Sequence, residues 1–156
     1  MNQKISALFK KYHDSFPYLI WGVSVLSMFG SLYFSEIMHL QPCKLCWWQR
    51  IFMYPIAFIL TVGILRKDAK AYLTVLPLSA VGMTIAFYHT LLQANIIKET
   101  LVNCTVDGAV SCANAQINWF GFITIPFMSF IAFFTITSLC VISIYNDRPT
   151  KEATKK

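Results

Sequence analysis

Four long apolar stretches, separated by short polar segments, dominate the pattern of the chain. The stretches cover residues 16–34, 47–65, 71–92 and 119–144. Arg50 is the only Asp, Glu, Lys or Arg within them. A helix needs about 20 apolar residues to cross the hydrocarbon core of a bilayer, and helices satisfy their own backbone groups in lipid, as isolated strands do not. The pattern predicts an all-α membrane protein: a four-helix transmembrane bundle that forms a single membrane domain over residues 1–156.

The composition excludes a soluble domain. The chain has 156 residues, of which 56% are hydrophobic and only 13% are charged. A soluble domain carries roughly a quarter charged residues, so this chain has too few polar side chains to cover a water-exposed surface. The same apolar content excludes intrinsic disorder.

The positive charges are concentrated in three places. Ten of the 13 Lys and Arg residues lie in residues 4–11, 66–70 and 148–156. Basic residues collect on the cytoplasmic side of membrane proteins. Both termini and the 66–70 turn are therefore predicted to be cytoplasmic, and loops 35–46 and 93–118 to be extracytoplasmic. Because these three segments hold most of the basic residues behind the net charge of +6, the rest of the chain has no basic stripe that could bind a phosphate backbone. No nucleic-acid partner is therefore expected.

This topology sorts the five cysteines. Cys43 and Cys46 form a C-x-x-C in the first outer loop, and Cys104 and Cys112 lie in the second. Cys140 falls near the cytoplasmic end of the fourth helix. Two close pairs on the oxidising side are typical of disulfide chemistry, whereas Cys140 is expected to be a small buried hydrophobic residue.

The C-x-x-C by itself is compatible with zinc binding as well as with redox chemistry. Its position favours redox chemistry, because Cys46 stands just before an apolar helix whose N-terminus lowers the pKa of a nearby thiol. Arg50 follows one turn later and adds a full positive charge. We therefore expect the thiolate at Cys46, with Cys43 as the more accessible partner for exchange, and no metal.

Arg50 and His89 are the ionisable side chains that we expect within the spans near the cysteines. Arg50 has two interpretations: an arginine that snorkels to a lipid phosphate, or a functional cation. The second is favoured because Cys46 lies one turn away. His89 is either a structural hydrogen-bonding group or a second member of the site, since it should lie at nearly the depth of Arg50.

An aromatic run follows the C-x-x-C: Trp47, Trp48, Phe52 and Tyr54. It has two interpretations, an interfacial aromatic belt or the lining of a slot for a planar, lipid-soluble ring. The first is favoured for at least one tryptophan.

Three motifs together resemble the DsbB family of membrane thiol–quinone oxidoreductases. Residues 41–50 read Gln-Pro-Cys-Lys-Leu-Cys-Trp-Trp-Gln-Arg, residues 87–93 read Phe-Tyr-His-Thr-Leu-Leu-Gln, and residues 118–122 read Asn-Trp-Phe-Gly-Phe. Ile125-Pro126 extends the match. The short second loop and Cys-Trp-Trp-Gln-Arg look most like BdbC, the Gram-positive branch of the family.

The resemblance implies a redox role for each outer cysteine. Cys43 and Cys46 would be the pair next to the quinone, with the Cys46 thiolate in contact with it. Cys104 and Cys112 would take electrons from an extracytoplasmic thioredoxin-like thiol oxidase of the DsbA or BdbD kind. The protein would then be a disulfide bond formation protein, a protein-disulfide:quinone oxidoreductase of the bacterial plasma membrane.

The resemblance also implies a cofactor site. Arg50, His89 and Trp47 would bind the quinone, which is expected to be menaquinone rather than ubiquinone and to come from the pool in the membrane lipid. The family carries an acidic residue just before the arginine. Gln49 stands there in this chain, so no role of that carboxylate carries over.

Three alternatives remain open. A vitamin K epoxide reductase-like enzyme also couples cysteine pairs to quinones, although that family places its loop cysteines before the C-x-x-C. A metal-thiolate protein would use the four outer cysteines as ligands. A structural membrane protein would carry two stabilising disulfides and leave the deep Arg50 unexplained.

Overall fold

The described part of the protein is helical throughout in the computed structural model. The structure describes residues 15–68, 70–97, 112–113 and 124–153. Its elements are α2 (Phe16–Leu32), the π-helical turn η2 (Tyr33–Ile37), α3 (Lys44–Leu65), α4 (Ala71–Gln93) and α5 (Ile125–Ala153). No strand occurs in these residues.

Four helices are long and apolar enough to cross a membrane, which confirms the predicted fold class. The candidate spans are Phe16–Ile37, Lys44–Leu65, Ala71–Gln93 and Ile125–Tyr145. The predicted second span, 47–65, begins three residues too late, because Cys43 caps the helix and Lys44 is already helical. For the predicted fourth span, 119–144, residues 119–123 lie outside the described part.

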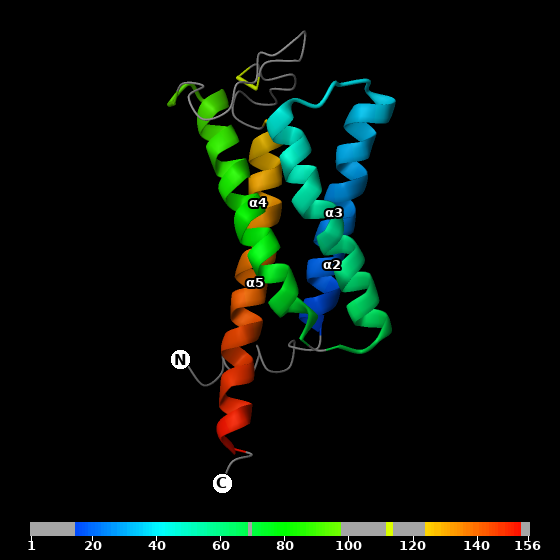
Figure 1. Ribbon diagram of the computed structural model, residues 1–156, viewed down its shortest axis with the longest axis vertical. Coiled ribbons are helices and arrows are strands. Elements are labelled where there is room, and N and C mark those ends of the chain that lie inside the picture. Colours follow the sequence, from blue (N-terminus) through cyan, green and yellow to red (C-terminus); the bar gives the residue numbers. More distant parts are fainter. Residues whose placement is uncertain (1–14, 69, 98–111, 114–123, 154–156) are drawn as a thin grey trace.

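The helices alternate in direction and close into a ring. Both α2 and α4 pack against α3 and against α5. Figure 1 shows the start of α2, the α3–α4 turn and the end of α5 at one end of the bundle, and the start of α3 and the end of α4 at the other. The turn is short: α3 ends at Leu65, α4 begins at Ala71, and the Asp68 amide bonds the carbonyl of Gly63 at 2.8 Å.

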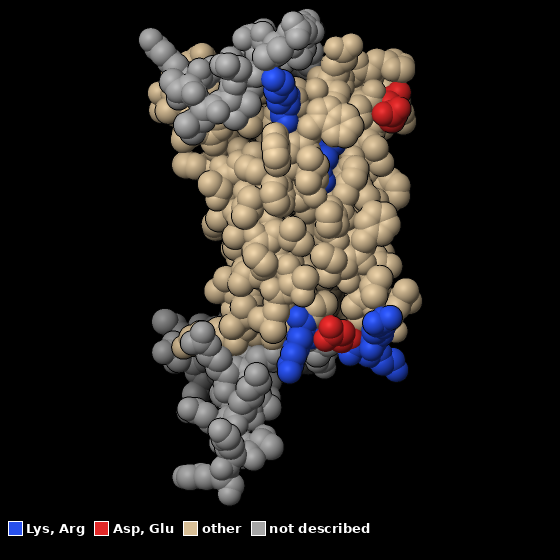
Figure 2. Space-filling view, in the orientation of Figure 1, with Lys and Arg blue, Asp and Glu red and all other residues tan. Residues whose placement is uncertain are grey.

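The surface matches a membrane environment. Figure 2 shows Lys, Arg, Asp and Glu mainly toward the two ends of the visible face, with a broad uncharged band between them. Large apolar side chains point outward along this band, for example Leu26, Phe58 and Phe134, which are 75%, 65% and 55% exposed. Such faces suit hydrocarbon and would be costly in water.

The core of the bundle is apolar and contains residues from all four helices. Its buried members include Ile20, Ile56, Val75 and Phe133. Polar contacts also join neighbouring helices: the Thr137 hydroxyl donates to Ser79 Oγ at 3.1 Å between α5 and α4, and Trp21 Nε1 donates to Thr61 Oγ1 at 2.8 Å between α2 and α3.

Helices α4 and α5 approach closely at Gly82. A Cβ atom at this position would overlap the ring of Phe133, which is fully buried. Small residues allow such close approach between membrane helices, where packing rather than the hydrophobic effect holds helices together.

We predict that Gly82→Ala destabilises the bundle, because the Phe133 ring must leave its position or the helices must separate. Overpacking of this kind costs about 1–3 kcal/mol. Thermal unfolding in detergent measures the effect, with Gly22→Ala as the matched control, since a Cβ at Gly22 meets nothing within 4 Å. Equal unfolding midpoints for the two variants would contradict this packing.

Candidate functional site

The first cysteine pair is built into the start of α3. Cys43 is the N-cap residue, with an extended backbone (φ −70°, ψ 171°), and Cys46 lies in the first turn. The Cys46 amide donates to Cys43 Sγ at 3.4 Å, and the two sulfur atoms are 3.0 Å apart. The C-x-x-C spacing thus brings both sulfurs to one side of the helix N-terminus, and both cysteines are thiols.

The Cys43 sulfur accepts the backbone N–H of Cys46 and contacts the Cys46 sulfur. The contact with the Cys46 side chain lowers the pKa of Cys43 from 9.0 to about 4; burial opposes this shift, and the contact with His89 adds to it. The thiolate expected at Cys46 stays a prediction, which the hydrogen bond from the Cys46 amide to Cys43 Sγ does not favour. In the first turn of a helix, a free backbone amide donates to the side chain of the N-cap residue. Here the N-cap residue is Cys43, whereas Cys46 already lies inside the helix.

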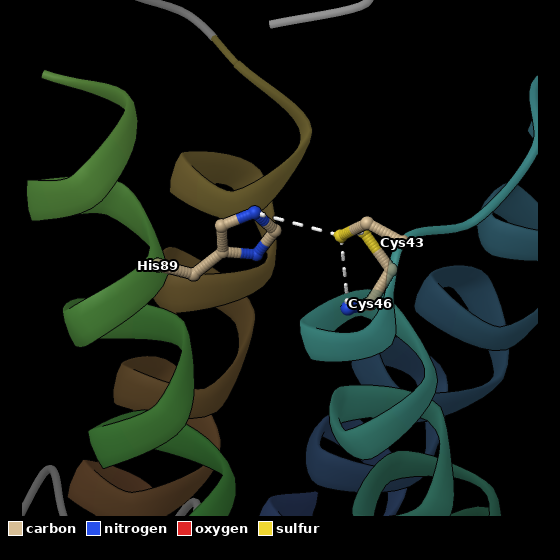
Figure 3. A group of neighbouring side chains, drawn as sticks. All are labelled: Cys43, Cys46 and His89. Carbon is tan, nitrogen blue, oxygen red and sulfur yellow. Dashed lines mark hydrogen bonds between the residues drawn. The ribbon is translucent and has the colours of Figure 1, made fainter. Parts of the chain in front are cut away.

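His89 connects this pair to the rest of the site. It comes from α4, is fully buried, and faces the start of α3 (Figure 3). Its Nε2 lies 3.7 Å from Cys43 Sγ and 3.2 Å from the backbone oxygen of Cys112. Its Nδ1 lies 3.0 Å from the amide nitrogen of Gln49.

Cys112 of the second loop lies against the first pair. It is fully buried, disulfide-bonded, and part of one apolar cluster with Cys43, Leu45 and Leu92. Cys104, the predicted partner of Cys112, lies outside the described residues. Cys43 is only 5% exposed and is less accessible than Cys46, so the expectation of an accessible Cys43 is wrong: the cluster around Cys112 covers it.

The guanidinium of Arg50 is held by α2. Its Nε donates to Ser31 Oγ at 2.8 Å, and one terminal nitrogen donates to the Ser31 carbonyl at 3.0 Å and to Ser35 Oγ at 3.1 Å. The Trp47 ring lies 5.4 Å from the guanidinium carbon, within the range of a cation–π contact. These protein partners argue against a snorkelling arginine that relies on a lipid phosphate.

A cavity of about 440 Å³ opens beside the two cysteines. It is bounded by α2, η2 and the segment that follows, α3, the end of α4 and the start of α5. Its lining includes Cys43, Cys46, Gln49, Arg50, Tyr54, Phe34, Met53, Gln93 and Pro126. This volume is in the range of small-molecule sites, and such sites combine an apolar lining with a few polar groups.

The aromatic run divides at this cavity. Tyr54 lines the cavity, and its buried hydroxyl has no hydrogen-bond partner among the described residues. Trp47 and Trp48 are 54% and 51% exposed and do not line it. The slot interpretation thus fits Tyr54, whereas the exposure of the two tryptophans fits an interfacial belt.

A planar quinone fits this cavity chemically. The walls are apolar, and the polar groups available for its carbonyl oxygens are the Tyr54 hydroxyl and the Arg50 guanidinium, since the Gln49 amide nitrogen is engaged by His89. A buried hydroxyl without a partner is unusual in a folded protein, and a ligand carbonyl would satisfy it. His89 does not line the cavity and touches it only through Gln49 and Cys43.

The structure also changes the metal alternative. The donor atoms of Cys43, Cys46 and His89 lie within 4.8 Å of one another, and two thiolates with an imidazole form a ligand set that suits zinc. The expected set of four cysteine thiolates is not available in this state, because Cys112 is disulfide-bonded.

Sequence reasoning missed four polar residues of the site. Gln49 contacts His89, Gln93 donates to the Cys112 oxygen at 3.4 Å, and Ser31 and Ser35 hold Arg50. Gln49 and Gln93 lie within the motifs of residues 41–50 and 87–93. Their place in these motifs was the only feature of the sequence that could have pointed to them. The two serines had none beyond their i, i+4 spacing on one helix face.

Residues 13–143 match the family described as "Disulfide bond formation protein DsbB". The chain is 43% identical over 126 residues to "Probable disulfide formation protein C 1" of Bacillus anthracis, covering 81% of this chain and 89% of that protein. It is 40% identical over 142 residues to "SPbeta prophage-derived disulfide bond formation protein B" of Bacillus subtilis (91% and 94% covered). "Disulfide bond formation protein C" of Bacillus subtilis is 46% identical over 121 residues (78% and 86% covered). No solved structure is significantly similar.

We predict that the reduced protein carries a thiolate at neutral pH whose absorbance at 240 nm disappears as the pH falls through about 4. The pKa of Cys43 is lowered from 9.0, so the thiolate form is complete well above pH 4 and is lost below it. Cys43→Ser should remove this transition and Cys140→Ser should keep it. The absence of a transition near pH 4 in the unmodified protein would contradict the lowered pKa of Cys43.

Proposed function

Because the chain belongs to the DsbB family of disulfide bond formation proteins, we propose that it reoxidises an extracytoplasmic thioredoxin-like thiol oxidase of the DsbA or BdbD kind. Electrons would pass from this partner to Cys104 and Cys112, then to Cys43 and Cys46, and finally to a quinone of the membrane pool. The chain would thus act as a protein-disulfide:quinone oxidoreductase.

The position of the first cysteine pair between two neighbours carries this proposal. On one side Cys43 lies in the same cluster as the disulfide-bonded Cys112. On the other side both Cys43 and Cys46 line the 440 Å³ cavity. A redox pair in contact with a second disulfide and with a ligand-sized cavity is the arrangement that a relay requires.

The relay is two successive thiol–disulfide exchanges followed by oxidation of the first pair. A thiolate of the partner attacks the Cys104–Cys112 disulfide; the partner leaves as a disulfide, and the loop pair becomes a dithiol. A loop thiolate then attacks Cys43 in the Cys43–Cys46 disulfide and expels Cys46. The second loop thiol closes the loop disulfide again, which leaves Cys43 and Cys46 reduced.

The quinone supplies the driving force, because it accepts two electrons and two protons as the Cys43–Cys46 disulfide forms again. The chain's own residues prepare this step. Arg50 adds positive charge at the cavity wall, and Tyr54 offers its unpartnered hydroxyl. Trp47 acts through Arg50, over which its ring lies. We propose menaquinone rather than ubiquinone, from the similarity to the Bacillus proteins.

The orientation follows from the described charges. Arg66, Lys67 and Lys70 gather at the α3–α4 turn, opposite the cysteine pair at the start of α3. The positive-inside tendency then puts the turn in the cytoplasm. We propose a multi-pass protein of the bacterial plasma membrane, with its cysteine pairs on the extracytoplasmic face.

Thiol trapping tests the relay. In membranes that contain a reduced thioredoxin-like partner but no quinone, the outer cysteines should become alkylatable, and added quinone should return them to disulfides. Cys46→Ala should abolish quinone reduction, because the first pair can no longer form its disulfide. Cys140→Ala, at the other end of the bundle, should leave it intact. Outer cysteines that remain disulfide-bonded whatever is added would refute the relay.

Arg50→Ala should raise the apparent quinone KM about tenfold, because a hydrogen bond to a charged group contributes roughly 1.5–3 kcal/mol and 1.4 kcal/mol is a factor of ten. Arg66→Ala, exposed at the opposite end of α3, is the matched control. Steady-state kinetics over a range of quinone concentrations measure both variants. An unchanged KM for Arg50→Ala would show that Arg50 does not bind the quinone and only links α2 to α3.

A further inference from the structure

Gln49 is buried beside the reactive cysteines and has one specific partner. Its side chain is 6% exposed, and its amide nitrogen lies 3.0 Å from Nδ1 of the fully buried His89. It stands one turn after Cys46 on α3, so this contact ties α3 to α4 at the level of the cysteine pair.

The partners of His89 determine which ring nitrogen carries the proton. Nε2 lies 3.2 Å from the backbone oxygen of Cys112. A carbonyl oxygen accepts hydrogen bonds and cannot donate them, so Nε2 must carry the hydrogen. In a neutral ring Nδ1 is then an acceptor, and the Gln49 amide must present its NH₂ group. The two ends of the ring thus require the same tautomer.

The Cys112 carbonyl is the group held by this arrangement. It receives the His89 Nε2–H at 3.2 Å and the Gln93 amide at 3.4 Å. Both donors come from the last turns of α4 and face the start of α3. They fix the backbone of Cys112, and therefore the loop disulfide, at the side of Cys43.

We propose that Gln49 is a positioning residue for exchange between the two cysteine pairs. Its amide keeps the ring proton of His89 on Nε2, and this N–H docks the Cys112 carbonyl so that the loop pair lies against Cys43. Gln49 acts through His89 and takes no part in bond making. This role of Gln49 in exchange rests on the proposed relay. The tautomer of His89 follows from the hydrogen bonds alone and does not depend on the relay.

Nitrogen-15 NMR of the ring tests the tautomer directly. With ring-labelled histidine, the chain gives three histidine signal pairs, and His89→Asn identifies the pair of interest. We expect a protonated Nε2 and an unprotonated Nδ1. Gln49→Glu, whose carboxylate can only accept, should draw a proton to Nδ1. A protonated Nδ1 in the unmodified protein would overturn the proposal.

Stopped-flow oxidation of the fully reduced protein by excess quinone separates the two steps. The first quinol equivalent reports oxidation of Cys43 and Cys46, and the second reports exchange with the loop pair. Cys112→Ser, which should lose the second phase, identifies it. Gln49→Leu should slow the second phase roughly tenfold and change the first by less than about twofold, as expected for one lost buried hydrogen bond.

Two further variants separate the possible outcomes. Gln93→Leu should slow the second phase without moving the His89 signals, because it removes a donor to the carbonyl and leaves the ring alone. Gln49→Met, which retains most of the side-chain volume, should behave as Gln49→Leu does. Equal slowing of both phases would assign Gln49 to the quinone cavity and overturn the proposal. A protein that oxidises neither pair with quinone would refute the relay itself and leave the tautomer result standing.

Discussion

A charge placed inside an apolar bundle must find its hydrogen-bond acceptors within the protein, and Arg50 is that charge. Its guanidinium takes three acceptors from Ser31 on α2 and Ser35 on η2. This fixes α2 against the first turns of α3, where Cys43 and Cys46 lie. The cavity lies beside these elements, and the half-buried Arg50 gives one of its walls a positive charge.

A second set of polar contacts fixes the opposite side of the cysteine pair. His89, held by Gln49, spans from α4 to Cys43 and to the backbone of Cys112. The start of α3 is thereby held from α2 and from α4. Lower in the bundle, close packing takes over, as at Gly82. Several directional polar contacts converge around the cysteine pair, whereas the remainder is held by apolar packing with single polar contacts such as that between Thr137 and Ser79.

The fold followed from the sequence because a long uncharged stretch has few alternatives in lipid. The cysteines, Arg50 and His89 stood out because such residues are rare in spans. The features that could not be predicted depend on which face of each helix packs against which face of its neighbours. The burial of Cys43, the role of Gln49 and the serine partners of Arg50 arise from side chains distant in sequence, and local periodicity carries no record of these pairings. The apolar pattern also does not determine which cysteine caps the helix, because that depends on the exact residue at which α3 begins.

The burial of Cys43 limits which thiols can reach this cysteine. A disulfide that is reoxidised by quinone and exposed to solution would be reduced by any small thiol. Quinone would then be consumed without oxidising the partner protein. Here Cys43 is only 5% exposed and lies in one cluster with the disulfide-bonded Cys112. Small thiols in solution are therefore kept from Cys43 by shape, without any need for chemical selectivity.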